Sequence, residues 1–391
     1  MKETINKHLL PLMGAIAGDI IGSPYELKGC RIKTTDFPLF SQDSTFTDDT
    51  ILTLAVAQWV VKRKSDLISL FYTMGNKYIN VGFGHAFKCW LRSDSPKPYN
   101  SWGNGSAMRV SSIGLACGTL QEVLDLAEQT ASITHNHPEG IKGAQAVAAS
   151  VYLAYWGFSK SNIKDYIEKT FKYNLNRTIE DIRETYSFDS SCQGSVPEAI
   201  IAFLESTNFE DAIRLAVSLG GDADTQASIA GAIAGAFYKI IPQSIISEIV
   251  KKLPNELLDI LYSFNDFIPP QEIMLAVTAK ETTVLSCYIQ YSFALGCTDV
   301  QKVSIPQGTR LELSYVPILN ENRYESYATF HLVNNREIIL SIVENEARLK
   351  YPEYLDEYKH LVERISLISK ISGLDNFEIS PLTMDDILAQ I

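Results

Sequence analysis

Two acidic clusters each come directly before an apolar helical segment, and their residue types suit the binding of metal ions. The first is residues 47–50 (TDDT) and the second is residues 220–225 (GGDADT). Helix capping needs only one such side chain, because a single oxygen accepts the hydrogen bonds of free first-turn amides. Each cluster instead supplies two carboxylates, and adjacent like charges are costly unless a cation neutralises them. The four carboxylates and the threonine hydroxyls are hard oxygen donors, which favours Mg²⁺ or Mn²⁺, as a pair bridged by a shared carboxylate.

Zinc fits this sequence less well. His135 and His137 in residues 134–138 (THNHP) are the only close histidines, and no cysteines are spaced as ligands. A histidine near a helix end usually serves as a cap or as a packed polar residue. The six cysteines are scattered without a CxxC pair, which is typical of reduced thiols and predicts a cytoplasmic protein.

A glycine-rich segment, residues 101–109 (SWGNGSAMR), is a second kind of candidate site. Its glycines allow backbone amides to approach an anion such as a diphosphate, and a helix follows. The same residue types also form ordinary tight turns, so both interpretations remain open. Residues 82–84 (GFG) are a weaker signal of the same kind. Glu26, in GDIIGSPYE, is either a surface carboxylate or a site residue, and no local pattern decides between the two.

The elements that must position these residues are helices throughout residues 1–268. Helical spacing of apolar residues predicts helices over residues 50–61, 121–134, 140–155, 197–204, 209–220 and 225–240. Glycines recur four residues apart at positions 14, 18 and 22 and again at 231 and 235. Glycine inside a helix is costly, so this spacing predicts a close approach between helices. We therefore predict an all-α domain.

The double proline in residues 265–270 (NDFIPP) predicts a domain boundary. Beyond it, β-branched and aromatic residues separated by turn residues predict strands. These strands cover residues 283–294, 310–317, 326–333 and 337–343, and an amphipathic helix follows over 353–372. We predict a small α+β domain over residues 269–391, which serves either for packing and dimerisation or as a lid that selects the substrate.

Composition restricts the classes of partner. The chain has 391 residues, 46% of them apolar, and a net charge of −12, which excludes wholesale disorder and disfavours nucleic acids and anionic membranes. No apolar run reaches the ~18 residues that a membrane span needs. The N-terminal LLPLMGAIAG faintly resembles a signal peptide, but Pro11 and Asp19 interrupt it and export is not expected.

Six segments in order resemble the ADP-ribosylglycohydrolase family, which includes dinitrogenase reductase-activating glycohydrolases and ADP-ribosyl-acceptor hydrolases. The segments are GAIAGDIIGSPYE, FTDDTILTLAVA, YNSWGNGSAMR, THNHPEG, QGSVPEAIIAFLES and GGDADTQASIAGAIAGAFY, and they span residues 11–240. Each is modest alone, whereas six in family order are a specific signal.

The resemblance implies an all-α ADP-ribosylglycohydrolase-like domain that holds two Mg²⁺ or Mn²⁺ ions. The implied metal ligands are Thr47, Asp48, Asp49, Asp222, Asp224 and Thr225, with Asp224 at the bridging position. Glu26 falls on a loop near the metals, and Glu26, Asp48 and Asp49 are the candidates for catalytic proton transfer. The implied substrate-binding residues are Gly103, Asn104, Gly105 and Ser106 at the diphosphate, His135 at the ligand, and Gly194 and Ser195 near the ribose and adenine.

The resemblance also implies a reaction. We expect hydrolysis of the N- or O-glycosidic bond between ADP-ribose and an acceptor, with arginine first and serine second, and release of free ADP-ribose. The expected partners are an ADP-ribosylated protein and ADP-ribose. Two alternatives remain: an acceptor that is a nucleic-acid base or a small metabolite, and a partner-binding immunity protein against an ADP-ribosylating toxin.

Overall fold

The structure is a computed structural model of the 391-residue chain. It describes residues 7–27, 29–62, 66–116, 120–265, 275–280, 282–290, 300–305, 307–308, 310–320, 323–332, 339–344 and 377–381. The chain divides into two compact units, Met1–Pro269 and Pro270–Ile391. This division lies one residue from the boundary that the double proline predicts, while the independence of the two domains stays a prediction.

The first unit is helical in its described residues, as the all-α prediction requires. Its α-helices are α1 (Leu10–Glu26), α2 (Asp48–Lys62), α3 (Leu67–Lys77), α4 (His85–Leu91), α5 (Leu120–Ser132), α6 (Pro138–Tyr155), α7 (Lys160–Phe171), α8 (Ile179–Thr185), α9 (Cys192–Glu205), α10 (Phe209–Val217), α11 (Ala223–Tyr238), α12 (Gln243–Lys252) and α13 (Asn255–Asn265). Short 3₁₀ helices are η1 (Lys7–Leu9), η2 (Asn104–Ser106) and η3 (Ile113–Leu115).

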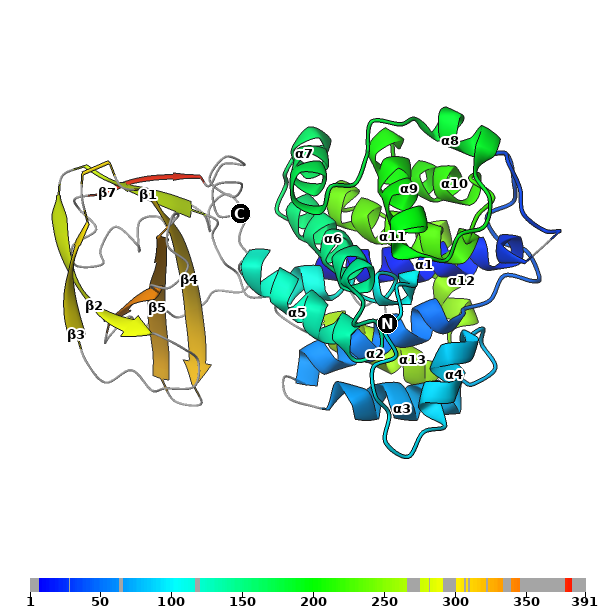
Figure 1. Cartoon of the computed structure of the whole chain (residues 1–391), viewed down its shortest axis with the longest axis horizontal. Coiled ribbons are helices and arrows are strands. Elements are labelled where there is room, and N and C mark those ends of the chain that lie inside the picture. The colour runs from blue at the N-terminus through cyan, green and yellow to red at the C-terminus, as the bar shows by residue number, and fades with distance from the viewer. Residues whose placement is uncertain are drawn as a thin grey trace. The chain divides into compact units, whose positions relative to one another are not determined.

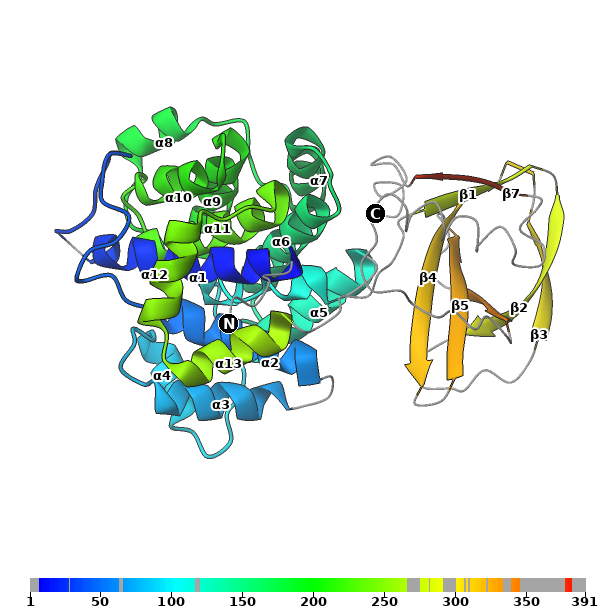
Figure 2. The ribbon, with the colours of Figure 1, turned by 180° about the vertical axis from the view of Figure 1, so that it is seen from behind.

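Helices α1 and α11 run side by side through the middle of this unit, and both are buried along most of their length (Figures 1 and 2). A Cβ atom added at Gly18 would lie 2.0 Å from the carbonyl oxygen of Ala227. One added at Gly22 would lie 2.5 Å from the carbonyl oxygen of Ala223. Only glycine permits backbones to approach so closely, which is the packing that the glycine spacing predicts. The contact holds the C-terminal end of α1 against the first turn of α11.

The predicted helices correspond to α2, α5, α6, α9, α10 and α11, with differences at their ends. The largest difference is at α9, which starts at Cys192 rather than at Pro197. The side chain of Ser191 caps it by accepting a hydrogen bond from the amide of Gly194, so Pro197 falls inside the helix. Apolar spacing does not detect this cap, so the predicted start lies too late in the chain.

The described residues of the second unit form antiparallel strands. These are β1 (Leu275–Ala279), β2 (Thr283–Gln290), β3 (Val300–Ile305), β4 (Arg310–Asn320), β5 (Arg323–Leu332), β6 (Ile339–Glu344) and β7 (Phe377–Pro381). They make one sheet in the order β3-β2-β6-β5-β4-β1-β7. The four predicted strands overlap β2, β4, β5 and β6. The predicted helix over residues 353–372 lies outside the described residues, so the α+β class of this unit stays a prediction.

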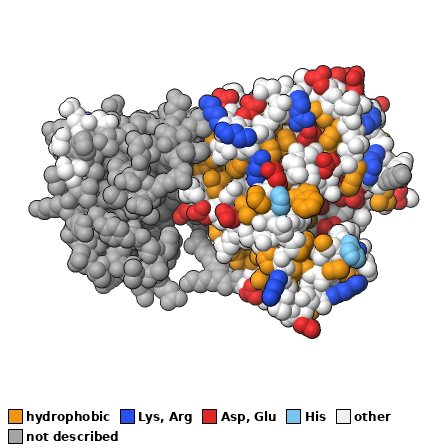
Figure 3. Space-filling model, viewed as in Figure 1, with side chains coloured by type: hydrophobic (Ala, Val, Ile, Leu, Met, Phe, Trp, Pro, Cys, Tyr) orange, Lys and Arg blue, Asp and Glu red, His pale blue; other side chains and the backbone are white. Residues whose placement is uncertain are grey.

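Two general properties of the described residues bear on partners. No helix among them is long and apolar enough to cross a membrane. On the face of the helical unit seen in Figure 3, lysine and arginine side chains are scattered among acidic and hydrophobic ones. The described part of that face therefore carries no continuous basic patch.

Candidate functional site

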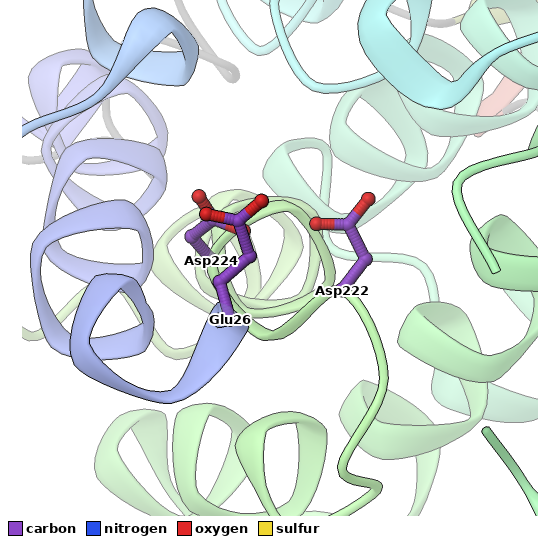
Figure 4. Close-up of side chains that lie close together, drawn as sticks. All are labelled: Glu26, Asp222 and Asp224. Atoms are coloured by element: carbon purple, nitrogen blue, oxygen red, sulfur yellow. The ribbon is translucent and has the colours of Figure 1, made fainter. Parts of the chain in front are cut away.

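Three carboxylates from two helix ends come together at one place in the helical unit. Glu26 ends α1, Asp222 precedes α11, and Asp224 lies in the first turn of α11. One carboxylate oxygen from each of the three lies within 4.8 Å of the other two, and Figure 4 shows the three side chains converging. Asp222 and Asp224 are buried and Glu26 is half-buried.

Asp19, a residue that sequence reasoning did not assign, organises the first acidic cluster. It is fully buried in α1 and accepts hydrogen bonds from the amides of Thr47 and Thr50, at 2.9 and 3.1 Å. It also accepts hydrogen bonds from both threonine hydroxyls, with 2.7 Å between the Oγ1 of Thr47 and Asp19. Four donors on one carboxylate fix the chain at the start of α2. A lone aspartate in an apolar helix was the available signal for this role.

The two acidic clusters are joined by a hydrogen bond between Asp49 and Thr225. The hydroxyl of Thr225 donates to Oδ2 of Asp49 at 3.3 Å. The other oxygen, Oδ1 of Asp49, is buried and has no hydrogen-bond partner among the described residues. A buried carboxylate oxygen without a donor is costly, and coordination of a cation would satisfy it.

Helix capping accounts for one of the clustered residues and fails for another. Oγ1 of Thr47 accepts a hydrogen bond from the amide of Asp49 at 3.2 Å, which is a cap of α2. Asp222 occupies the N-cap position of α11 but makes no side-chain capping bond. Its Oδ2 instead accepts a hydrogen bond from the side-chain amide of Asn104 at 2.9 Å. Asp222 is therefore oriented toward the glycine-rich loop rather than toward its own helix.

The electrostatics of this site favour a bound cation. Burial and neighbouring carboxylates, among them Asp19, raise the pKa of Asp48 to about 8. Burial is also the largest cause that raises the pKa of Asp49 and of Asp224 well above the usual value, and neighbouring acids add to it. It likewise raises the pKa of Asp222 and of Glu26, which the charge of Arg31 partly opposes. A divalent cation would reverse these shifts, because it stabilises the ionised carboxylates.

Asp48 lies against Gly82, which belongs to the GFG segment that is only a weak site signal in the sequence. Gly82 has a φ of +120°, and a Cβ atom built there would lie 2.9 Å from Oδ1 of Asp48. Any other residue would be strained by the backbone and would crowd the carboxylate. The GFG segment therefore serves the first acidic cluster.

The glycine-rich loop is tied to the start of α9. Gly103 pairs with Ser191 in an isolated β-bridge, and the amide of Asn104 donates to the carbonyl of Ser190 at 2.8 Å. The side-chain amide of Asn104 donates to Oγ of Ser195 at 3.1 Å as well as to Asp222. Asn104 therefore connects the carboxylates to the predicted ribose and adenine side of the site.

Two predicted ligand residues have their polar groups engaged inside the protein. The hydroxyl of Ser106 is buried and donates to the carbonyl of Gly140 at 2.7 Å. The carbonyl of Gly194 accepts a hydrogen bond from the hydroxyl of Tyr186 at 2.6 Å. These contacts position the loop and α9.

Comparison with known proteins assigns the family. The model of the family described as ADP-ribosylglycohydrolase matches residues 4–266. The chain belongs to the ADP-ribosylglycohydrolase family. It is therefore a hydrolase of this family, and family membership supports hydrolysis of an ADP-ribose linkage as its reaction.

Several relatives and one solved structure agree with this assignment. The chain is 27% identical over 301 residues to ADP-ribosylhydrolase ARH3 of Xenopus tropicalis, which covers 58% of this chain and 85% of that protein. It is 26% identical over 312 residues to the Homo sapiens ARH3, covering 60% and 86%. It is 26% identical over 284 residues to ADP-ribosylarginine hydrolase Tri1 of Pseudomonas putida, covering 63% and 76%. A structure titled ADP-ribosylglycohydrolase-related protein complex has the same fold, with a TM-score of 0.52 and 22% identity over 68% of this chain and 99% of that one.

In this ADP-ribosylglycohydrolase, His135 faces the glycine-rich loop. It is buried, and burial together with the charge of Arg109 lowers its pKa well below the usual value. Cβ atoms built at Gly103 and Gly105 would lie 3.5 and 3.2 Å from its Nε2. A Cβ atom at Gly105 would crowd this ring, whereas one at Gly103 would meet it at an ordinary van der Waals distance.

The structure brings the predicted site residues of this ADP-ribosylglycohydrolase to one region. The carboxylates of both clusters, Glu26, the glycine-rich loop, His135 and the start of α9 are joined by the contacts above. Their roles as metal ligands, catalytic groups and substrate contacts stay predictions. Asp19 and Gly82 are the residues that sequence reasoning did not assign to the site.

Proposed function

We propose that this chain is a divalent-metal-dependent hydrolase that removes ADP-ribose from a protein side chain, with arginine the first choice of acceptor and serine the second. The similarity to the ADP-ribosylarginine hydrolase Tri1 of Pseudomonas putida supports the order of acceptors. The absence of a membrane-spanning helix among the described residues and the free thiols of Cys30, Cys89 and Cys192 fit the cytoplasmic location that we propose.

The observation that carries the proposal is the donor set around Asp49. A buried carboxylate oxygen without a hydrogen-bond donor lies in a group of acids whose pKa values are all raised. Oxygen donors of this kind fit Mg²⁺ or Mn²⁺ better than zinc, because the described residues bring no histidine or cysteine into the acidic group. The proposed ligands of two such ions are Thr47, Asp48, Asp49, Asp222, Asp224 and Thr225.

Bound Mg²⁺ or Mn²⁺ would supply positive charge that orients the ribose hydroxyls and lowers the pKa of a water molecule. The residues of the chain do the remaining work. Asn104 positions the loop through its bonds to Ser195 and Asp222, the backbone of Gly103 and Gly105 holds the diphosphate, and Ser195 lies toward the ribose and adenine. Glu26, Asp48 or Asp49 accepts the proton of the water that attacks the anomeric carbon of the distal ribose, as the bond to the acceptor breaks. Glu26 is the first candidate, because it is half-buried and burial and neighbouring acids raise its pKa.

Release of ADP-ribose from arginine- and serine-modified proteins tests this proposal. The assay compares Mg²⁺, Mn²⁺ and EDTA, in the wild type and in the Asp48→Asn and Asp224→Asn variants. We expect metal-dependent release that falls by at least about 100-fold in both variants. Asp43→Asn is the matched control, because Asp43 is an exposed aspartate of the loop before α2 and should leave the rate unchanged. Release that persists in EDTA, or that survives both substitutions, would contradict the proposed metal site.

A further inference from the structure

Arg109 carries a buried positive charge behind the glycine-rich loop. Its side chain is fully buried, and its guanidinium carbon lies 4.6 Å from the ring centroid of Phe71. Its Nε and Nη1 atoms have no hydrogen-bond partner among the described residues. Burial lowers the pKa of Arg109 to about 10, so it stays charged at neutral pH. A buried cation with unused donors is costly, which indicates a role beyond packing.

The hydrogen bonds of Arg109 connect it to His135 through the hydroxyl of Thr134. Nη2 of Arg109 donates to the carbonyl of Thr130 at 2.7 Å and to Oγ1 of Thr134 at 3.0 Å. Oγ1 of Thr134 in turn lies 2.7 Å from Nδ1 of His135. Arginine has no acceptor, so the Thr134 oxygen must accept from it. The side chain of Thr134 also hydrogen-bonds Tyr99. When the Tyr99 hydroxyl donates to the second lone pair of Oγ1, the hydroxyl proton of Thr134 is left for Nδ1 of His135.

The direction of that hydrogen bond determines which ring nitrogen of His135 carries a proton. A nitrogen that accepts a hydrogen bond carries none, so in a neutral ring the proton sits on Nε2. His135 is kept neutral because burial and the charge of Arg109 both lower its pKa. The aromatic ring of Tyr99 packs beside it at 5.8 Å between centroids. No carboxylate is among the groups that shift this pKa among the described residues.

The Nε2 edge of His135 faces the loop that we propose holds the diphosphate. Glycine at position 105 keeps this edge free of a side chain, since a Cβ atom there would approach Nε2 to 3.2 Å. An N–H group at this place donates to a phosphate or hydroxyl oxygen of a ligand. The other tautomer would present a lone pair, which repels an ionised phosphate oxygen.

We propose that Arg109 and Thr134 are positioning residues that fix the Nε2–H tautomer of His135 and present this N–H to ADP-ribose at the Gly103–Gly105 loop. This inference rests on the proposed function for the identity of the ligand. It adds two residues that touch no ligand and act through a third.

The tautomer is measured directly by histidine-selective ¹⁵N NMR of the full-length wild-type protein, with the His135 signal assigned by its loss in His135→Gln. We expect a neutral ring at neutral pH, protonated at Nε2, with an Nδ1 that accepts a hydrogen bond. A ring protonated at Nδ1, or a cationic ring, would overturn the proposal without any further variant.

Binding of ADP-ribose, measured by calorimetry, tests the positioning role. Thr134→Val keeps the size of the side chain but removes the hydroxyl, and we expect about three- to tenfold weaker binding together with a mixed tautomer signal. Thr134→Ser keeps the hydroxyl and should bind within about twofold of the wild type. Wild-type affinity and an unchanged tautomer in Thr134→Val would refute the role of Thr134.

A second pair of variants tests the donor itself. His135→Gln places an amide N–H near the Nε2 position, whereas His135→Met places none, so Gln should retain more affinity than Met. Equal loss of affinity in both variants would show that no N–H donation occurs.

Arg109→Met should raise the pKa of His135 in the NMR titration, and an unchanged pKa in a folded variant would remove Arg109 from the proposal.

The outcomes separate this inference from the proposed function. If the wild type binds ADP-ribose but His135 is the Nδ1–H tautomer, the proposed function stands. The proposal that Arg109 and Thr134 fix the Nε2–H tautomer is then overturned. A wild type that does not bind ADP-ribose overturns both the function and the presentation of the N–H to this ligand. The NMR measurement does not depend on catalysis. Neither a missing metal nor a wrongly chosen acceptor can therefore change the tautomer that it reports.

Discussion

At the residue scale, Asp19 makes the clearest case for a side chain that acts on the site from inside the core. It sits in α1 and accepts four hydrogen bonds from Thr47 and Thr50. Asp19→Asn replaces one acceptor oxygen by an amide that faces donors. We expect a loss of roughly 2–4 kcal/mol in the free energy of unfolding and weaker metal binding, because the TDDT segment loses its anchor.

Urea unfolding and Mn²⁺ titration of the same preparation measure the two effects of Asp19→Asn. Asp36→Asn is the control, since Asp36 is exposed in the loop between α1 and α2. If Asp19→Asn loses stability but binds metal as the wild type does, Asp19 supports the fold alone.

The pKa values of the carboxylates predict how metal binding depends on pH. In the metal-free protein burial raises the pKa of Asp48 to about 8, and Asp49 and Asp224 shift in the same direction. A raised pKa in the folded state stabilises the metal-free fold at low pH, and this stabilisation is lost as the pH rises toward 8. Cations compete with the same protons, so the affinity for Mg²⁺ or Mn²⁺ should rise between about pH 5 and pH 8.

Calorimetry in two buffers of different ionisation enthalpy measures the protons that metal binding releases. We expect a net release near neutral pH that shrinks as the pH approaches 8. If metal binding releases no protons at any pH, these carboxylates are already ionised in the metal-free protein. That result would contradict their raised pKa values.

Much of the site could be predicted from the chemistry of adjacent residues. The TDDT and GGDADT clusters are visible because their carboxylates are neighbours in sequence, and the glycine-rich loop is visible for the same reason. Asp19 was missed because its role depends on burial, and a single aspartate in a helix has the same sequence appearance when it is exposed. The bond between Thr225 and Asp49 joins residues far apart in the chain, which no local pattern encodes.

At the element scale, the packing of α1 on α11 determines whether the carboxylates meet. The glycine spacing predicted this close approach, although it could not say which helices were partners. Gly18→Ala places a methyl group against the backbone of Ala227. Backbone cannot move aside as a flexible side chain can, so we expect a loss of about 1–3 kcal/mol or more in the free energy of unfolding. Activity should fall with it, because Glu26 lies further along the same helix.

Gly84→Ala is the matched control for the helix crossing. A Cβ atom built at Gly84 has no neighbour within 4 Å, so the substitution adds a methyl group in open space. Thermal unfolding should report a small change for Gly84→Ala, at most about 1 kcal/mol from the loss of a good N-cap residue. Alanine has the higher helix propensity, so that property alone would stabilise the helix at Gly18. A Gly18→Ala variant as stable as the wild type would therefore contradict the backbone contact.

The ends of the helices were harder to predict than their existence. Apolar periodicity identified α9, but its start depends on the cap that Ser191 provides to the amide of Gly194. A serine followed by Cys192 and Gln193 has no special pattern, so apolar spacing alone does not extend the predicted helix back to this cap. The predicted start is therefore too late, and the consequence is functional, because Ser195 lies in the segment that the prediction left out of the helix.

At the scale of the whole molecule, the placement of the site within one unit makes a prediction about the other. Every residue assigned to the site lies between Asp19 and Thr225, inside the unit Met1–Pro269. A chain truncated after Pro269 should therefore bind metal and ADP-ribose as the full chain does. If the second unit serves for packing or dimerisation, as we expect, the truncated chain should also keep the same preference between arginine- and serine-modified proteins.

Calorimetry with ADP-ribose and the release assay on both modified proteins compare the two chains, with thermal unfolding as the check that the shorter one is folded. A changed ratio of the two release rates with unchanged ADP-ribose affinity would identify the second unit as a selector of the acceptor. Loss of ADP-ribose binding in a folded truncated chain would show instead that the first unit is incomplete without the strands β1 to β7. The three outcomes are distinguished by whether the ADP-ribose affinity or the ratio of the two release rates changes. The affinity depends on the helical site, whereas the ratio depends on the residues that contact the modified protein.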